Sequence, residues 1–197
     1  VCSPRGDNNY ACAIPGASTG GDLFSWLSEA RSPAADADVP LLIWLNGGPG
    51  SSSLIGLFFE SGPYTISSSA ALKPNPFSWN EKYHTLFVDQ PVGTGFASCP
   101  TDACYATTLT QVGSMFVDFL NGIYARHAEL AASPLFITGE SFAGKYIPYI
   151  ADAILARGDI DDVDRMMALG ARGLSKVELG DSRGARKDVL DGLDIAD

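Results

Sequence analysis

The chain has few basic residues and no long apolar run, and each of these features excludes a class of protein. Thirteen lysines and arginines stand against 23 aspartates and glutamates, which gives a formal net charge of −10 at pH 7. Nucleic-acid-binding proteins need a basic face, so this balance argues against nucleic acid as a partner. No apolar run approaches the length that crosses a bilayer, so no membrane span is expected.

Cysteine is also scarce, and its spacing is not that of a metal site. The four cysteines are Cys2, Cys12, Cys99 and Cys104, and no two of them stand as C-x-x-C. Four cysteines allow three pairings, among which sequence alone does not choose. We favour the two local pairs, Cys2 with Cys12 and Cys99 with Cys104. Four free, buried thiols are the alternative.

Aromatic residues and proline are absent from residues 158–197, where ten acidic residues stand against six basic ones. A segment of that composition has little with which to build a packed core. We therefore interpret residues 1–157 as the folded unit and the remainder as a divergent acidic tail outside it. The alternative is a genuine acidic helix whose apolar face carries Met166, Leu169 and Leu174.

Short apolar runs alternate with helix-like segments along the folded unit. Apolar runs bounded by turn residues indicate buried strands, and the spacing of Val112, Met115 and Phe116 is typical of a helix. Strands that alternate with helices imply parallel crossovers in an α/β sheet. The stretch through Gly21 is expected to be loop with one short strand. The expected strands are 22–27, 39–45, 85–88 and 135–138, and the expected helices are 54–60, 107–130 and 142–157.

A sharp turn between the strand 135–138 and the helix 142–157 is the feature around which the chain is organised. Gly139 stands two residues before Ser141, and Ala143 stands two residues after it. A strand, a tight turn with small neighbours and a helix form the context of a nucleophile elbow. The turn would expose the serine hydroxyl above the start of the helix. The simpler interpretation is that Ser141 only caps this helix.

Four motifs carry a resemblance to a known family. They are G-E-S-F-A-G-K-Y-I-P from Gly139, W-L-N-G-G-P-G-S-S-S from Trp44, F-S-W-N from Phe77 and D-Q-P-V-G-T-G-F from Asp89. Together, and in the order in which they stand along the chain, they resemble the serine carboxypeptidases, and in detail the vitellogenic-like branch of that family. Ser51 departs from the family's pattern, which has cysteine at this position.

The resemblance covers roughly the first four-fifths of the chain and implies an α/β-hydrolase fold. Residues 1–157 would form the N-terminal half of a mostly parallel sheet with flanking helices, truncated after the nucleophile helix. Residues 158–197 do not match the family's pattern, which supports placing them outside its fold.

The resemblance also implies a role for each residue of a peptide-cleaving site. Ser141 would be the nucleophile, and the backbone N–H groups of Gly48 and Phe142 would form the oxyanion hole. Two nearby acids can share a proton, and a neutral acid can donate a hydrogen bond to a peptide's terminal carboxylate. The residues implied to bind that carboxylate are Asn46, Gly47, Glu60 and Glu140.

The general base is missing from its usual place in the chain. In this fold the catalytic residues follow the order serine, acid, histidine. His84 and His127 are the only histidines, and both precede Ser141. We expect each of them to be a surface or half-buried residue without a catalytic role. Asp161, Asp162 and their neighbours cannot be assigned as the acid.

The predicted function is therefore that of a serine-type carboxypeptidase, which removes C-terminal residues from peptides or proteins through an acyl-enzyme. The resemblance implies no metal and no cofactor, and it places the protein in the secretory pathway, either secreted or in a vacuole or lysosome. Two other functions are compatible with the same motifs. One is a catalytically inactive fragment or binding protein, which the missing base favours for this chain. The other is an acyltransferase of similar fold.

Overall fold

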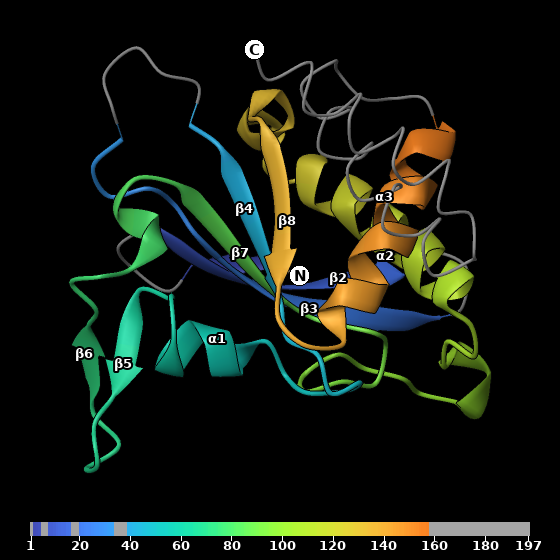
Figure 1. Ribbon diagram of the computed structural model, residues 1–197, viewed down its shortest axis with the longest axis horizontal. Helices are drawn as coiled ribbons and strands as arrows, with labels where there is room; N and C mark the ends of the chain where they lie inside the picture. The colour runs from blue at the N-terminus through green and yellow to red at the C-terminus, as the bar shows by residue number, and fades with distance from the viewer. Residues whose placement is uncertain (1, 5–7, 17–19, 34–38, 158–197) are drawn as a thin grey trace.

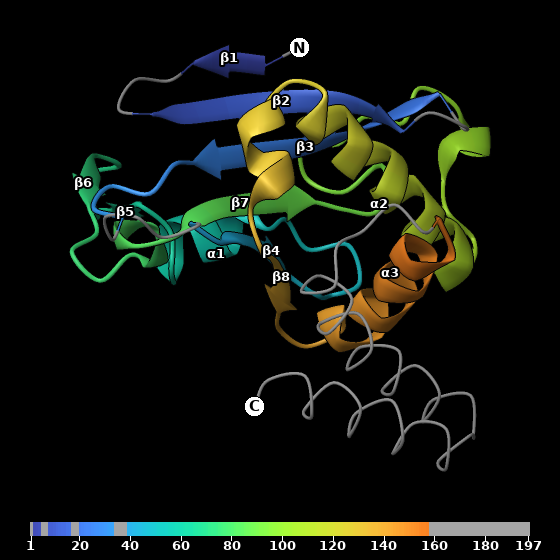
Figure 2. The same ribbon diagram turned by 90° about the horizontal axis from the view of Figure 1, so that it is seen from above.

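A six-stranded sheet runs through the molecule in the order β1-β2-β3-β7-β4-β8 (Figure 2). The computed structural model describes residues 2–4, 8–16, 20–33 and 39–157. The strands of this sheet are β1 (Cys2–Pro4), β2 (Asn9–Gly16), β3 (Gly21–Ser28), β4 (Leu41–Leu45), β7 (His84–Asp89) and β8 (Leu135–Gly139).

The sheet is mixed, and its parallel part carries the motifs. Strand β4 pairs in parallel with β7 on one side and with β8 on the other. Strands β1, β2, β3 and β7 pair antiparallel in sequence order. The carboxyl ends of β4, β7 and β8 therefore meet at one edge, where the segments that follow them come together.

Helices cover both faces of the sheet (Figure 1). On one face lie α2 (Leu109–Tyr124) and α3 (Ala143–Arg157), and on the other lies α1 (Leu54–Phe59). Alternation along β4 explains this arrangement, because neighbouring side chains of a strand point to opposite faces. Trp44 packs against Gly56 of α1, where a Cβ atom would lie only 2.2 Å from the indole nitrogen. The core beneath α2 and α3 contains the alternate residues Leu41, Ile43 and Leu45.

The expected α/β architecture is confirmed, and the expected elements differ from the observed ones mainly at their ends. The strand predicted from Val39 begins at Leu41, and the helix predicted over 107–130 covers only α2. This helix begins after Thr108, whose side chain accepts from the backbone N–H of Gln111 in a capping box. It ends before His127, whose backbone leaves the helical region. A separate 3₁₀ helix, η3 (Ala128–Ala132), follows.

The prediction that the start of the chain is mostly loop is wrong. Strand β2 is eight residues long and pairs along its whole length with β3. Its small residues and its Pro-Gly end hide the alternation of Tyr10, Cys12 and Ile14, and the pairing with β3 decides its structure. Cys12 is disulfide-bonded, and Cys2 lies opposite it in the register of β1 and β2. The side chain of Cys2 lies outside the described part of the structure.

A hairpin that the sequence did not reveal extends beside α1. It consists of β5 (Tyr64–Ile66) and β6 (Leu72–Pro74), which pair antiparallel in a separate sheet. The short helix η1 (Trp79–Glu81) then leads to β7. None of the helices in the described residues is long and apolar enough to cross a membrane.

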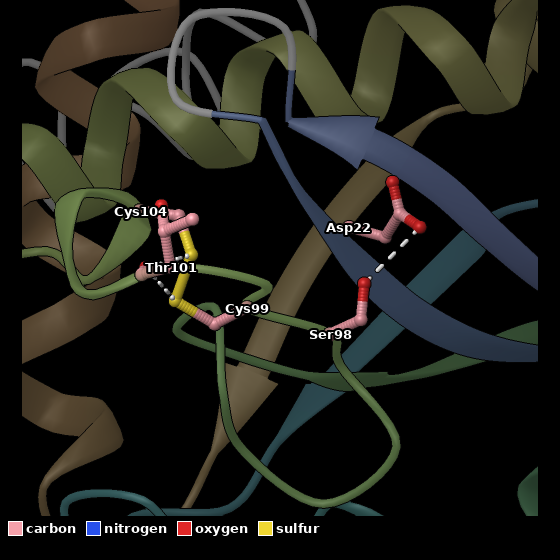
Figure 3. The surroundings of a disulfide bond; sticks show 5 residues. All are labelled: Asp22, Ser98, Cys99, Thr101 and Cys104. Atoms are coloured by element: carbon pink, nitrogen blue, oxygen red, sulfur yellow. Dashed lines mark hydrogen bonds between the residues drawn. A yellow bond between two sulfur atoms is a disulfide. The ribbon is translucent and has the colours of Figure 1, made fainter.

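The predicted disulfide between Cys99 and Cys104 is present (Figure 3). It closes a short loop that contains the 3₁₀ helix η2 (Asp102–Cys104). Ser98, directly before this loop, forms an isolated antiparallel bridge with Asp22 of β3. The Ser98 hydroxyl donates to the Asp22 carboxylate at 3.2 Å. These bonds fix the segment after β7 to the beginning of β3.

Candidate active site

Ser141 stands at a strained turn directly after β8. Its φ angle is +56°, in the left-handed region that residues with a side chain rarely adopt. A Cβ atom on Gly139 would lie 2.3 Å from the carbonyl oxygen of Leu45 and 2.7 Å from the side chain of Ala143. The turn is thus too tight for a larger residue at this position. This is the geometry of a nucleophile elbow, with the serine side chain exposed.

The turn that follows β4 lies against the elbow. A Cβ atom on Gly47 would meet the backbone nitrogen of Phe142 at 2.4 Å and the Ser141 side chain at 3.0 Å. The next residue, Gly48, has a φ angle of +110°. Within the described residues, neither the N–H of Gly48 nor that of Phe142 has a hydrogen-bond acceptor. Two unused backbone donors therefore flank the contact between the turn and the elbow.

Asn46 connects this turn to the residue before the serine. Its side-chain nitrogen donates to a carboxylate oxygen of Glu140 at 2.8 Å. Its side-chain oxygen accepts from the indole N–H of Trp44 at 2.8 Å and from the backbone N–H of Gly56 at 3.2 Å. These bonds identify which atom of the side-chain amide is the oxygen and which is the nitrogen, and the nitrogen faces Glu140.

Glu60, at the end of α1, lies near enough to Glu140 for their charges to interact. Partial burial raises the pKa of Glu60 above its ordinary value, and the charge of Glu140 raises it further. In the described structure Glu140 accepts a hydrogen bond from Asn46, and no hydrogen bond joins the two acids. The structure thus joins Asn46 to Glu140, the residue before Ser141, and places Glu60 within reach of the charge of Glu140.

Comparison with known proteins shows the family of the chain. The family model of the serine carboxypeptidases matches residues 13–166. The chain belongs to the serine carboxypeptidase family.

Individual relatives agree with this assignment. A pheromone-processing carboxypeptidase of Tuber melanosporum is 45% identical over 139 residues, which are 71% of this chain and 22% of the relative. The vitellogenic carboxypeptidase of Aedes aegypti is 38% identical over 133 residues, 68% of this chain and 28% of the relative.

A solved structure confirms the α/β-hydrolase fold of a serine carboxypeptidase. The prohormone-processing carboxypeptidase of Saccharomyces cerevisiae superposes with a TM-score of 0.71 at 35% identity. The match covers 79% of this chain and 36% of that protein. The chain thus spans between about a fifth and about a third of the lengths of these three relatives.

Both histidines lie at the opposite edge of the sheet from Ser141. His84 begins β7, in register with Leu41 and through it with Leu135 at the start of β8. At ~3.3 Å per residue, the five residues of β8 alone separate the two edges by about 13 Å. His127 precedes η3, which leads into the amino end of β8 (Figure 1). A general base must lie within hydrogen-bond reach of the serine, so neither histidine can serve.

The expectation that His127 is a surface or half-buried residue is wrong, because it is only 7% exposed. Its ring packs edge-on against Tyr10 with the centroids 5.0 Å apart, and its Nδ1 lies 3.2 Å from Glu129. His84 is half-buried, as expected. Asp161 and Asp162 lie outside the described residues. No cluster of side chains that could hold a metal occurs in the part of the chain that the structure describes.

His84 should make the fold sensitive to acid. Burial lowers its pKa below the ordinary value of 6.5, although the carboxylates of Glu29 and Glu129 oppose this shift. The backbone N–H of Ala30 donates to its Nδ1 at 3.3 Å, which requires an unprotonated nitrogen. The stability that this gives is present above the unfolded-state pKa and is lost as pH falls through the lower, folded-state pKa.

We expect His84→Asn, which keeps an acceptor but does not titrate, to reduce this dependence. Urea unfolding at pH 7 and pH 5 should show a smaller loss of unfolding free energy in the variant than in the wild type. Equal losses of unfolding free energy in the two proteins would show that His84 does not cause the sensitivity to acid.

Sequence reasoning missed the polar network beneath the turn after β4. Asp89, the last residue of β7, accepts hydrogen bonds from Ser52, Ser53 and Phe96. The available signal was a carboxylate directly at the carboxyl end of a buried parallel strand, which is where ligand sites of α/β sheets are built.

Proposed function

We propose that this chain carries the nucleophile and the substrate-carboxylate site of a serine carboxypeptidase. The observation that supports this most is the contact of Asn46 with Glu140 directly beside the strained Ser141. An amide donor and two acids at this point suit a peptide's C-terminal carboxylate. The substrate would be the C-terminus of a peptide or protein, held so that its last peptide bond lies over the serine.

In the proposed reaction the Ser141 oxygen attacks the carbonyl carbon of the last peptide bond. The negative charge that develops on the carbonyl oxygen would be stabilised by the unused N–H groups of Gly48 and Phe142. The C-terminal amino acid leaves as the acyl-enzyme forms, and water then releases the shortened peptide. The proton from Ser141 must pass to a base that the described residues do not supply near the serine.

The carboxylate site would work best in acid. The raised pKa of Glu60 keeps its carboxyl group protonated to a higher pH than usual, so that it can donate to a substrate carboxylate. As the pH rises through this pKa, Glu60 loses its proton and repels the substrate. Affinity for C-terminal carboxylates should therefore decrease as pH rises.

Glu140→Gln tests this site. The glutamine can still accept from Asn46 through its oxygen, and its nitrogen donates at every pH. We expect the affinity of the 197-residue chain for N-acetyl-phenylalanine, measured by calorimetry from pH 4.5 to 7.5, to fall less steeply in the variant. Parallel curves for the two proteins would reject the role of the acid pair, and equal affinity for N-acetyl-phenylalaninamide would reject a carboxylate site altogether.

A second candidate function is peptide binding without turnover. It is favoured by the position of both histidines at the far edge of the sheet and by the absence of histidine after Ser141 in these 197 residues. The carboxylate site does not need the base, so it would remain functional in such a protein.

The proposed location is the secretory pathway, with the protein secreted or in a vacuole or lysosome. The Cys99–Cys104 disulfide supports this proposal, since disulfides persist in oxidising compartments. An acid-favoured carboxylate site would also suit an acidic compartment.

A further inference from the structure

A buried carboxylate joins three segments underneath the candidate site. Asp89 ends β7 and is only 1% exposed. One of its oxygens accepts from the Ser52 hydroxyl and from the backbone N–H of Ser53, each at 2.7 Å. The other oxygen accepts from the backbone N–H of Phe96 at 2.9 Å. In the described residues no lysine or arginine pairs with it, so these donors alone offset the cost of burying the charge.

The first two bonds fix the far end of the turn 46–53. The Ser53 hydroxyl donates to the carbonyl oxygen of Val88 and accepts from the backbone N–H of Asn46 at 3.0 Å. Asn46 at the start of the turn is therefore bound to Ser53 at its end, and Ser53 is bound to the end of β7. Gly47 and Gly48 lie between these fixed points.

The third bond fixes the segment 91–98 against the same carboxylate. A Cβ atom on Gly95 would lie 2.2 Å from an Asp89 oxygen and 2.9 Å from the Ser52 hydroxyl. The backbone of this segment thus passes directly over the carboxylate. Ser98, two residues after Phe96, is fixed to Asp22 of β3 (Figure 3).

We propose that Asp89 is a positioning residue for the Ser141 site. By holding Ser53 it sets where Asn46 and the N–H of Gly48 lie relative to the serine, although it touches no substrate itself. That Asp89 affects substrate binding rests on the proposed function. That Asp89 holds the turn 46–53 in place does not depend on it.

Asp89→Asn removes the charge and one acceptor while keeping the side chain's shape. Loss of hydrogen bonds to a charged acceptor should speed amide hydrogen exchange at Ser53 and Phe96 about 10- to 100-fold. We expect the amide of Asn46, which donates to the Ser53 hydroxyl, to be accelerated with them, whereas the β2–β3 amides keep their wild-type rates. Exchange in the 197-residue chain can be followed residue by residue by NMR.

The affinity for N-acetyl-phenylalanine should fall by a similar factor, although Asn46, Glu60 and Glu140 are all unchanged. Asp102→Asn is the matched control, because it makes the same chemical change at an exposed residue of η2. It should alter neither the exchange of the turn nor the affinity.

Ser52→Ala provides a second variant, which removes one of the three bonds to Asp89 together with the bond that the backbone N–H of Leu54 donates to the Ser52 hydroxyl at 3.2 Å. Its effects should have the same pattern and be smaller, and it decides the question if Asp89→Asn does not fold. Wild-type exchange at Asn46, or acceleration spread evenly over the whole sheet, would overturn the positioning role. If the wild-type chain binds the amide as well as the acid, the proposed function fails, and the exchange pattern still decides the role of Asp89.

Discussion

Gly47→Ala is expected to abolish carboxylate binding and to lower the free energy of unfolding by ~1–3 kcal/mol, the usual cost of forcing extra atoms into a packed site. The new Cβ atom would lie 2.4 Å from the backbone nitrogen of Phe142 and 2.9 Å from the carbonyl oxygen of Glu140. Both contacts are with backbone, so no side-chain rotation relieves them. The turn and the elbow would have to separate. Urea unfolding and calorimetry with N-acetyl-phenylalanine measure the two effects.

Gly144→Ala is the matched control for this change. A Cβ atom at Gly144 meets nothing within 4 Å, and the residue lies in the first turn of α3. Alanine is the better helix former by up to ~1 kcal/mol, so stability should be equal or higher and binding unchanged. If Gly47→Ala behaves like Gly144→Ala, the close contact between turn and elbow does not exist in solution.

The second large effect concerns turnover. We expect the 197-residue polypeptide to release C-terminal residues from peptides at no more than ~10³–10⁴ times the uncatalysed rate, which is what an oxyanion hole and a binding site can provide without the full triad. The reason is the position of His84 and His127 at the opposite edge of the sheet from Ser141. Chromatographic assay of released amino acids measures the rate.

The variants His84→Ala and His127→Ala should leave any residual rate unchanged. Turnover at the 1–10³ s⁻¹ of ordinary enzymes, or its loss in either variant, would contradict this account. It would require a base that the described geometry does not show.

The sequence sufficed for the part of the fold that local patterns determine. Strands β4 and β7 are short apolar runs closed by turn residues, because their neighbours bury them. Strand β8 has the same pattern, although it is the outer strand of the described sheet and only its Leu135 is buried. The elbow at Ser141 needs small residues, and Gly139 supplies the one that the observed clash distances require. The candidate site residues Asn46, Glu60 and Glu140 followed from the family resemblance, and the structure joins the first and the last of them by a hydrogen bond.

Features that depend on distant partners were not predictable in this way. Strand β2 has weak strand-forming residues, and its pairing with β3 creates it. The helix predicted as far as Leu130 ends at Tyr124 instead. Three residues later the ring of His127 packs against Tyr10 in a buried contact. The role of Asp89 depends on Ser52 and Ser53, which lie 37 and 36 residues away in the sequence.

The central claim is that Asn46, Glu60 and Glu140 form a site for a peptide's terminal carboxylate beside Ser141. NMR titration of the 197-residue chain with N-acetyl-phenylalanine, and separately with its amide, tests it most directly. We expect the acid alone to shift the Asn46 side-chain signals and the backbone signals of Gly48 and Phe142, with weaker affinity at pH 7 than at pH 5. Equal binding of acid and amide, or shifts confined to other parts of the molecule, would contradict the claim.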